Sequence, residues 1–219
     1  MSLKANIKAI IFDMDGVISD TQSLHSSVES ELLKEYGVDI HPDEITYRYA
    51  GTTSYQMFPH VFSSFAVAMP DLEMLVEEKR RRIDKATHGN VRAVPGTKEF
   101  IQGVKAKNLP IAIASASRLE YIDIVVSELG IKESFNALAS SMEVENGKPE
   151  PDVFLLAASR LGVLPENCVV IEDGIAGMIG AKRGGMQCIG LVRTKDNREY
   201  PADLIVSDLR DVQINDYLV

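Results

Sequence analysis

Two carboxylates stand two residues apart where an apolar run of the sequence ends. The run is Ile7–Phe12, and Asp13-Met14-Asp15-Gly16 follows it directly. If the run is a β-strand, Asp13 and Asp15 point the same way with Cα atoms ~7 Å apart. Carboxylates held side by side repel each other, which favours a bound cation or a shared proton. Because only oxygen ligands are on offer, Mg²⁺ suits this pair better than zinc.

The same pair could perform phosphoryl chemistry. One carboxylate can attack phosphorus and form an aspartyl phosphate, while the other moves protons. Gly16 lets the backbone approach a ligand closely or turn at positive φ. We therefore predict a magnesium-dependent phosphoryl-transfer centre at Asp13 and Asp15. The alternative interpretation is an acidic turn at a strand end.

A serine-rich motif follows another apolar run, Ile111–Ala114. Ser117 and Glu120 have the spacing of a helix capping box. This predicts a structural role for Ser117 and leaves the Ser115 hydroxyl, with nearby backbone N–H groups, free to hold a phosphate oxygen. A serine at a strand end is by itself more often a turn residue.

Two further motifs carry charge. Lys148 lies in Gly147-Lys148-Pro149, and a lysine at a helix entrance could neutralise a phosphoryl oxygen or a nucleophilic carboxylate. Glu172 and Asp173 end the apolar run that begins at Cys168, and they are natural partners for a metal ion held by Asp13. The plainer alternatives are a solvated lysine and helix N-capping by Asp173.

The elements that must position these motifs alternate along the chain. Short apolar runs alternate with stretches of helical period, which is typical of an α/β fold with a mostly parallel sheet. Ligands of such sheets bind at the carboxyl ends of the strands, where all four motifs lie. The predicted strands are Ile7–Phe12, Ile111–Ala114, Ala137–Ser140, Cys168–Ile171, Gln187–Val192 and Leu204–Val206. The predicted helices between them are Thr97–Lys107, Leu119–Leu129, Pro151–Leu161 and Ile175–Arg183.

The interval from about Gln22 to Asn90 contains helical stretches and no convincing strand. In one of them an apolar or aromatic residue recurs every four residues, and another runs from Asp71 to about Ala86. The recurring residues are Leu24, Val28, Leu32 and Tyr36. We predict a catalytic core of residues 1–20 and 91–219, with residues 21–90 inserted as an α-helical cap. The hinges would lie near Asp20–Thr21 and Asn90–Pro95.

Composition limits the partners and the location. The net charge of −9 argues against nucleic acid as the main partner. No apolar run approaches the roughly 20 residues that cross a bilayer, and the N-terminus has no signal-peptide pattern. Cys168 and Cys188 lie in apolar runs and are expected to be buried free thiols, which suits a reducing cytoplasm. We expect a cytoplasmic protein without a membrane partner, either a monomer or a weak homo-oligomer.

Taken together, the four motifs closely resemble those of the haloacid dehalogenase-like hydrolase superfamily. They match in order and spacing, from Ile7 to about Val206. The helical insert looks like the small cap of the branch that contains β-phosphoglucomutase and the sugar-phosphate or phosphoglycolate phosphatases. That resemblance implies a Rossmann-like three-layer core. The motifs are Asp13-Met14-Asp15-Gly16-Val17-Ile18-Ser19-Asp20-Thr21, Ser115, Lys148-Pro149 and Glu172-Asp173-Gly174.

The resemblance also implies a role for each motif. Asp13 would be the nucleophile and a ligand of Mg²⁺. Asp15 would be the general acid and base, with its backbone carbonyl facing the metal ion. Asp173 would complete the metal site, and Glu172 would be either a ligand or a support behind the ligands.

The phosphoryl group would be held by the other two motifs. Gly16 would allow close approach of the backbone, and Ser115 with the Ala116 amide would bind the phosphoryl oxygens. Lys148 would balance the charge around the nucleophile and those oxygens. Such a division of work fits phosphoryl transfer, in which positioning and charge neutralisation supply most of the rate.

Two reactions of this branch begin with the same aspartyl phosphate. Thr21, His25 and the basic Arg118 after Ser115-Ala116-Ser117 look similar to a β-phosphoglucomutase. In such mutases a cap-loop lysine and arginine hold the second phosphate, and both are missing from the loop at residues 49–54. Leu119 also replaces the asparagine expected after Arg118. Because a second dianion would be poorly compensated here, a phosphatase is the better prediction.

Other cap residues could contact the substrate. Arg48 lies just upstream of the cap loop, and Lys79 lies where this branch often has a lysine. The run Lys79-Arg80-Arg81-Arg82 has an alternative interpretation as a solvated helix face, paired as Glu77 with Arg81 and Glu78 with Arg82. His25 is expected to be a polar residue of the hinge rather than a catalyst.

The sequence therefore predicts a Mg²⁺-dependent phosphatase of a small phosphorylated metabolite, expected to be a sugar phosphate. A β-phosphoglucomutase-type phosphomutase is the alternative. A ligand-sensing domain without catalysis is a third hypothesis, which the intact carboxylates oppose.

Overall fold

A six-stranded parallel sheet forms the centre of the protein. The structure is a computed structural model that describes residues 3, 6–194 and 197–212. The strand order is β3-β2-β1-β4-β5-β6, and every neighbouring pair is parallel. The predicted α/β fold is confirmed. The strands are β1 (Ala9–Phe12), β2 (Ile111–Ser115), β3 (Ala137–Ser140), β4 (Cys168–Glu172), β5 (Gln187–Leu191) and β6 (Leu204–Val206).

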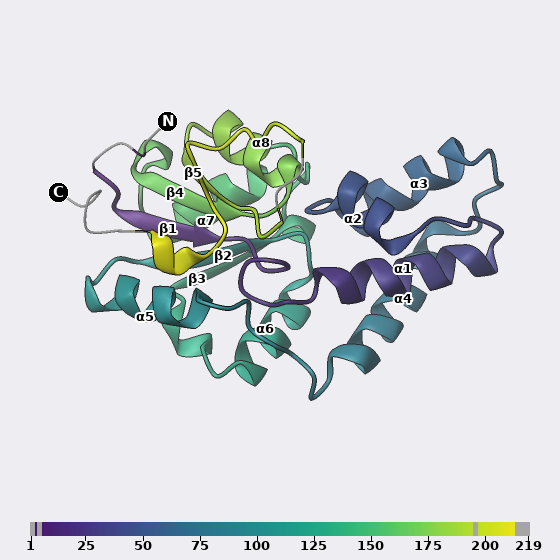
Figure 1. Cartoon of the computed structure of the whole chain (residues 1–219), viewed down its shortest axis with the longest axis horizontal. Coiled ribbons are helices and arrows are strands. Elements are labelled where there is room, and N and C mark those ends of the chain that lie inside the picture. The colour runs from purple at the N-terminus through teal and green to yellow at the C-terminus, as the bar shows by residue number, and fades with distance from the viewer. Residues whose placement is uncertain (1–2, 4–5, 195–196, 213–219) are drawn as a thin grey trace.

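Helices cover both faces of the sheet, so the core has three layers (Figure 1). Ile10 and Phe12 of β1 pack in the cluster that contains residues of α5 and α6, whereas Ala9 and Ile11 pack with α7 and α8. A strand covered on both faces has no polar side, which explains the unbroken apolar sequence of β1. The four helices are α5 (Thr97–Ala106), α6 (Leu119–Glu128), α7 (Asp152–Leu161) and α8 (Ile175–Arg183).

Two strands run one residue further than the apolar pattern predicts. β2 includes Ser115 and β4 includes Glu172, and both side chains are buried. A polar side chain can be buried at a strand end when it has a hydrogen-bond partner, and each of these side chains accepts a hydrogen bond. These two extra residues bring chemical groups directly to the carboxyl edge of the sheet. In the other direction, β1 begins at Ala9 rather than Ile7.

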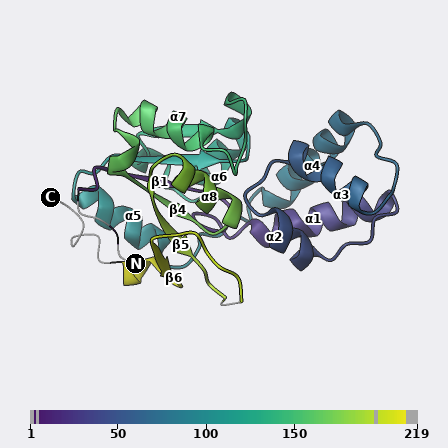
Figure 2. The ribbon, with the colours of Figure 1, turned by 90° about the horizontal axis from the view of Figure 1, so that it is seen from above.

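Four helices inserted between β1 and α5 form a second group beside the sheet (Figures 1 and 2). We call them the cap helices: α1 (Gln22–Glu35), α2 (Pro42–Tyr49), α3 (Ser54–Ser64) and α4 (Leu72–Thr87). They enclose an apolar cluster of their own, which includes Leu32 and Phe58. Further along α1 towards the sheet, Leu24 and Val28 pack with the core cluster instead. The apolar stripe of α1 therefore joins the two parts of the molecule.

The two chain segments that connect the cap helices to the core run side by side. The Asp20 N–H donates to the Arg92 carbonyl at 2.8 Å, and the Val94 N–H donates to the Ile18 carbonyl at 3.0 Å. These segments fall at the predicted hinges. The division of the chain into residues 1–20 with 91–219 and residues 21–90 stays a prediction.

Both cysteines are free and buried, Cys168 in β4 and Cys188 in β5, as predicted. Burial raises the pKa of the Cys168 thiol to about 11, so this thiol is a poor nucleophile near neutral pH. Within the described ranges, no helix combines the length and apolar character that a membrane span requires.

Candidate active site

A buried lysine links two of the motifs at the carboxyl edge of the sheet. The Lys148 ammonium lies 2.5 Å from Asp13 Oδ1 and 2.6 Å from Glu172 Oε1, and its side chain has no exposed surface. β1 and β4 are neighbours, so Asp13 and Glu172 end adjacent strands. Burial lowers the pKa of the lysine, but the two carboxylates outweigh this and raise it above its ordinary value. Lys148 therefore stays protonated and holds two carboxylates together.

Asp173 brings a third carboxylate to the same place. Asp13, Glu172 and Asp173 each offer an oxygen within 4.8 Å of the others. Burial, followed by the charges of Glu172 and Asp13, raises the pKa of Asp173 well above its ordinary value. Among the residues that the structure describes, no donor is recorded to the Asp173 carboxylate, and the helix it precedes is capped by Gly174 without a side-chain bond. The helix-capping alternative for Asp173 is therefore wrong.

The donor set of this cluster fits a hard divalent cation. Its atoms are all carboxylate oxygens, which Mg²⁺ prefers, and one lysine does not balance three clustered carboxylates. The two oxygens of Glu172 already accept bonds from Lys148 Nζ and from the Gly174 N–H at 2.7 Å. Asp13 and Asp173 are thus better placed to bind the ion directly, with Glu172 as their support.

Gly16 makes room for the Asp173 carboxylate. A Cβ atom on Gly16 would lie 1.9 Å from Asp173 Oδ2, and the residue has a φ of +87°. Both facts require glycine at this position. The absence of a side chain at Gly16 thus lets the fourth motif approach the first and form one site with it.

Replacing Gly16 by alanine should therefore weaken metal binding. We expect Gly16→Ala to displace the Asp173 carboxylate and lower the affinity for Mg²⁺ by about tenfold or more. Gly37→Ala is the matched control, because Gly37 has a similar φ of +83° with nothing within 4 Å of the added Cβ. Calorimetric titration with Mg²⁺ measures both variants. Equal Mg²⁺ affinity in the two variants would contradict this use of Gly16.

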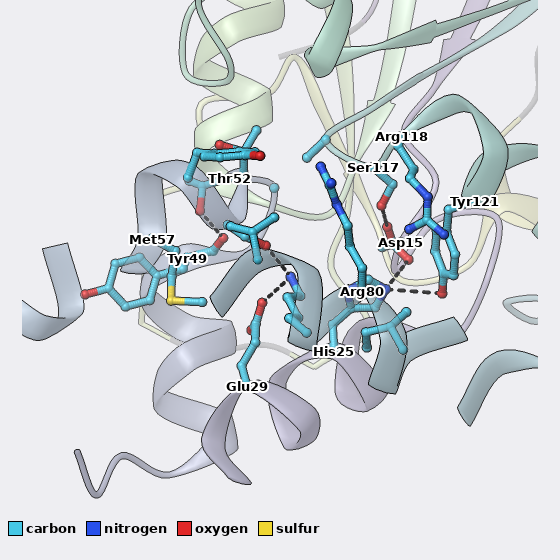
Figure 3. A pocket seen from close by; sticks show the side chains of 18 of the residues that line it. Asp15, His25, Glu29, Tyr49, Thr52, Met57, Arg80, Ser117, Arg118 and Tyr121 are labelled. Carbon is cyan, nitrogen blue, oxygen red and sulfur yellow. Dashed lines mark hydrogen bonds and ion pairs between the residues drawn. The ribbon is translucent and has the colours of Figure 1, made fainter. Parts of the chain in front are cut away.

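Asp15 lies in a separate hydrogen-bond group. Its carboxylate accepts hydrogen bonds from the Thr21 hydroxyl and, at 3.3 Å, from the Ser117 hydroxyl. His25 Nε2 lies 3.4 Å from Asp15 Oδ1 and 3.2 Å from the Tyr121 hydroxyl. Burial raises the pKa of the Asp15 carboxyl, although these hydroxyl bonds oppose it. Figure 3 shows Asp15, His25, Ser117 and Tyr121 converging in one pocket.

The predicted capping box of α6 is wrong. The helix begins after Arg118, which makes no side-chain cap bond, so Ser117 lies one residue too early to cap it. The Ser117 hydroxyl points to Asp15 instead. The Ser115 hydroxyl accepts a bond from the Ser117 N–H at 3.0 Å, and it keeps its own proton to donate. Ser117 thus contacts Asp15 instead of capping α6, and Ser115 accepts a bond from the backbone while its hydroxyl can still donate to a ligand.

The cap helices close over the carboxyl edge of the sheet. One pocket is lined by Asp13, Asp15 and Ala116 from the core and by His25 and Lys79 from the cap helices, among other residues. A Cβ on Gly51 of the cap loop would lie 3.7 Å from Glu172 Oε1. The cap loop therefore lies next to the Glu172 carboxylate, and cap and core residues line one pocket.

Two predicted cap residues line this pocket. Lys79 Nζ lies 2.5 Å from Glu29 Oε1 and 2.7 Å from the Ser54 hydroxyl, in the interior rather than in solvent. His25 is mostly buried, and burial lowers its pKa to about 3, so it is neutral near pH 7. A neutral His25 does not form an ion pair with Asp15.

Arg48, by contrast, is not among the residues that line this pocket. On α2, Ile45 and Tyr49 share the helix face that lines the pocket. Arg48 pairs with Glu44 at 2.7 Å and borders a second cavity, which Gly16 and Asp173 also line. The contact of Arg48 with substrate stays a prediction.

The rest of the basic run agrees in part with the solvated-face alternative. Arg82 pairs with Glu78 at 2.8 Å, as that interpretation predicts. Arg81 pairs with Glu78 and not with Glu77. Arg80 and Arg118 both line the pocket (Figure 3).

Sequence reasoning missed Glu29, a buried carboxylate of the pocket. A signal existed, because Glu29 follows His25 by four residues and so shares its helix face. Tyr121 was missed for a different reason. It lies on a core helix, far along the chain from His25, and its hydroxyl bonds His25 at 3.2 Å and Thr87 at 3.0 Å.

Comparison with known proteins agrees with this architecture. Residues 10–191 match the haloacid dehalogenase-like hydrolase model, and the chain belongs to that family. It is 30% identical to hexitol phosphatase B of Escherichia coli K12 over the whole length of both chains. It is 28% identical to the phosphorylated carbohydrates phosphatase of Thermotoga maritima, over 84% of each chain. Phosphatase activity is thus the activity that the relatives support.

A solved structure gives the same fold. The β-phosphoglucomutase of Clostridium difficile superposes with a TM-score of 0.81 at 28% identity, covering 95% of this chain and 94% of that one. The family resemblance inferred from the four motifs is confirmed by these matches.

Proposed function

We propose that this protein is a Mg²⁺-dependent phosphatase that hydrolyses a small phosphorylated sugar through an aspartyl phosphate on Asp13. The observation that carries the proposal is the cluster of Asp13, Glu172 and Asp173 around the buried Lys148, directly beneath the cap. Relatives named for hexitol and phosphorylated-carbohydrate substrates support the sugar.

In the first half of the reaction, an Asp13 carboxylate oxygen attacks phosphorus. The bond from phosphorus to the ester oxygen breaks, and Asp15 gives its proton to the leaving alkoxide. Burial raises the pKa of Asp15 above its ordinary value, which favours the protonated form that a general acid uses. Thr21 and Ser117 orient the Asp15 carboxyl for the transfer.

In the second half, water attacks the phosphorus of the aspartyl phosphate. Asp15 is now ionised and takes the proton of that water, while the Asp13 carboxylate leaves. Inorganic phosphate is released, and both carboxyl groups return to their starting states. The two half-reactions thus use the same pair of side chains in opposite directions.

Charge neutralisation is shared between the metal ion and the protein. Asp13 and Asp173 would hold Mg²⁺, with Glu172 behind them, and when bound the ion neutralises phosphoryl charge. Lys148 fixes the orientation of Asp13 and contributes a second positive charge. The Ser115 hydroxyl and the Ala116 amide bind the phosphoryl oxygens.

A phosphomutase is the second candidate, because of the likeness to β-phosphoglucomutase. Such a mutase must hold a second phosphate against the cap. The cap loop at Gly51, Thr52 and Thr53 offers no basic side chain for this. Interconversion of glucose 1-phosphate and glucose 6-phosphate, stimulated by a bisphosphate, would favour the mutase.

The proposal is tested by phosphate release from a panel of sugar phosphates. We expect turnover with Mg²⁺ and loss of turnover when EDTA removes the ion, restored by excess Mg²⁺. Circular dichroism in EDTA controls for unfolding. Unchanged turnover in EDTA would contradict the metal requirement, and no release from any ester would contradict the phosphatase.

A further inference from the structure

We infer that Glu29 makes the pocket selective for a neutral polyhydroxylated group, so that the accepted ester carries no second negative charge at its far end. This inference rests on the proposed phosphatase function, and it names the substrate class and the residue that enforces it. Glu29 points into the pocket from α1, on the side of the cap (Figure 3).

Glu29 neutralises the most buried cation that the cap contributes to the pocket. Lys79 Nζ lies 2.5 Å from Glu29 Oε1, with side-chain exposures of 13% and 10% for the two residues. Lysine carries three N–H donors, and Ser54 takes a second one at 2.7 Å. The pair therefore offers a donor and an acceptor to a ligand without offering net charge.

The other cations of the pocket are paired as well. Arg118 lies 2.6 Å from Asp84, and Arg80 is bonded to Glu77. Both arginines also border a neighbouring surface cavity, which places them at the rim. His25 adds no positive charge near neutral pH because burial lowers its pKa to about 3. A second phosphate or carboxylate on the substrate would thus enter a pocket whose described cations are already compensated.

A sugar or polyol matches the hydrogen-bond donors and acceptors that the pocket offers. Hydroxyl groups both donate and accept, and the pocket presents Lys79 as a donor and Glu29 as an acceptor, with Thr52 and Ser54 beside them. An added anionic group would instead lose water beside Lys79, whose charge Glu29 already compensates, and burying an uncompensated charge is costly. Glu29 acts here both by attraction to hydroxyls and by rejection of anions.

Two substrates differ only in the feature that Glu29 is inferred to select. Sorbitol 6-phosphate and 6-phosphogluconate have the same six-carbon acyclic chain, but the second ends in a carboxylate. For the native protein we expect kcat/KM to favour sorbitol 6-phosphate by about tenfold or more, because the carboxylate of 6-phosphogluconate would be desolvated beside cations that are already compensated. For Glu29→Gln we expect the ratio to fall by about tenfold, because the Lys79 charge is no longer compensated.

Glu35→Gln is the matched control for this variant. Glu35 also lies on α1 and pairs with α4, through Arg82 at 2.8 Å, but outside the pocket. The change alters net charge and helix pairing in the same way, and the substrate ratio should stay within about twofold because exposed ion pairs contribute little.

The double variant Glu29→Gln/Lys79→Met distinguishes charge from damage to the fold. It removes both members of the pair, so we expect the ratio to return toward the native value. A native enzyme that hydrolyses both esters equally well, or a Glu29→Gln ratio equal to the native one, would overturn the inference while leaving the phosphatase in place. Absence of phosphate release from every ester would overturn the proposed function instead.

Discussion

Asp13→Asn is expected to abolish phosphate release, with kcat lower by about 10⁴-fold or more, as for loss of a catalytic nucleophile. The amide cannot attack phosphorus, yet it has nearly the same shape and can still accept a bond from Lys148. It also removes one of three crowded negative charges, so the fold should tolerate it. Steady-state hydrolysis of p-nitrophenyl phosphate with saturating Mg²⁺ measures the loss.

Asp203→Asn is the control for the effect of losing an aspartate charge. Asp203 pairs with Lys182 at 2.6 Å and is not among the residues that line the pocket. Its replacement should change kcat by less than about twofold, as is usual for exposed pairs. Substantial turnover by Asp13→Asn, with a native melting temperature, would sink the nucleophile assignment.

Lys148→Met is expected to have the second largest effect, on both activity and stability. Methionine fills much of the volume but leaves the buried Asp13 and Glu172 carboxylates without their cation. Breaking a buried ion pair in this way costs about 3–5 kcal/mol. Urea unfolding in EDTA should show this loss of free energy of unfolding, and phosphate release should be lost as well.

The loss should depend on pH in a defined direction. Burial raises the pKa of Glu172 above its ordinary value, and Lys148 opposes that rise. Without the lysine the pKa rises further, so the folded state binds more protons than the unfolded state between the two pKa values. The stability of Lys148→Met in EDTA should therefore improve as pH falls from 8 towards 5. A deficit that is constant across this range would contradict the buried-charge explanation.

A matched surface lysine separates this effect from simple loss of charge. Lys182 is 39% exposed and pairs with Asp203, which also accepts the Cys188 N–H at 2.8 Å. Lys182→Met leaves that carboxylate with a partner and with water. We expect it to cost less than about 1 kcal/mol, with little pH dependence.

The catalytic edge could be predicted from the sequence because the carboxyl ends of parallel strands lie at one edge of the sheet. Asp13, Ser115 and Glu172 end three neighbouring strands, so their chain separation does not matter once the strand order is right. Lys148 followed from its motif and from the family resemblance. Periodicity also located α1 and α4 correctly, because their apolar residues recur at helical spacing.

The cap residues were harder to predict because their roles depend on how helices pack. Lys79 and Arg48 are both basic residues on cap helices, yet only Lys79 lines the pocket. Glu29 is a charged residue on a helix, and such residues are ordinarily exposed to solvent. Its pairing with Lys79 depends on where α4 packs, which the sequence does not show. The prediction for Ser117 was wrong for a local reason. The helix begins one residue later than expected, and the Ser117 hydroxyl donates to Asp15 instead.

The central claim is that Asp13 becomes phosphorylated during turnover, and borohydride trapping tests it most directly. The protein is mixed with a sugar phosphate and Mg²⁺, quenched rapidly, reduced with borohydride and mapped by peptide mass spectrometry. Because borohydride reduces an acyl phosphate to an alcohol, we predict conversion of Asp13 to homoserine, and no conversion without substrate. Conversion at Asp15 instead, or no conversion anywhere during active turnover, would contradict the account.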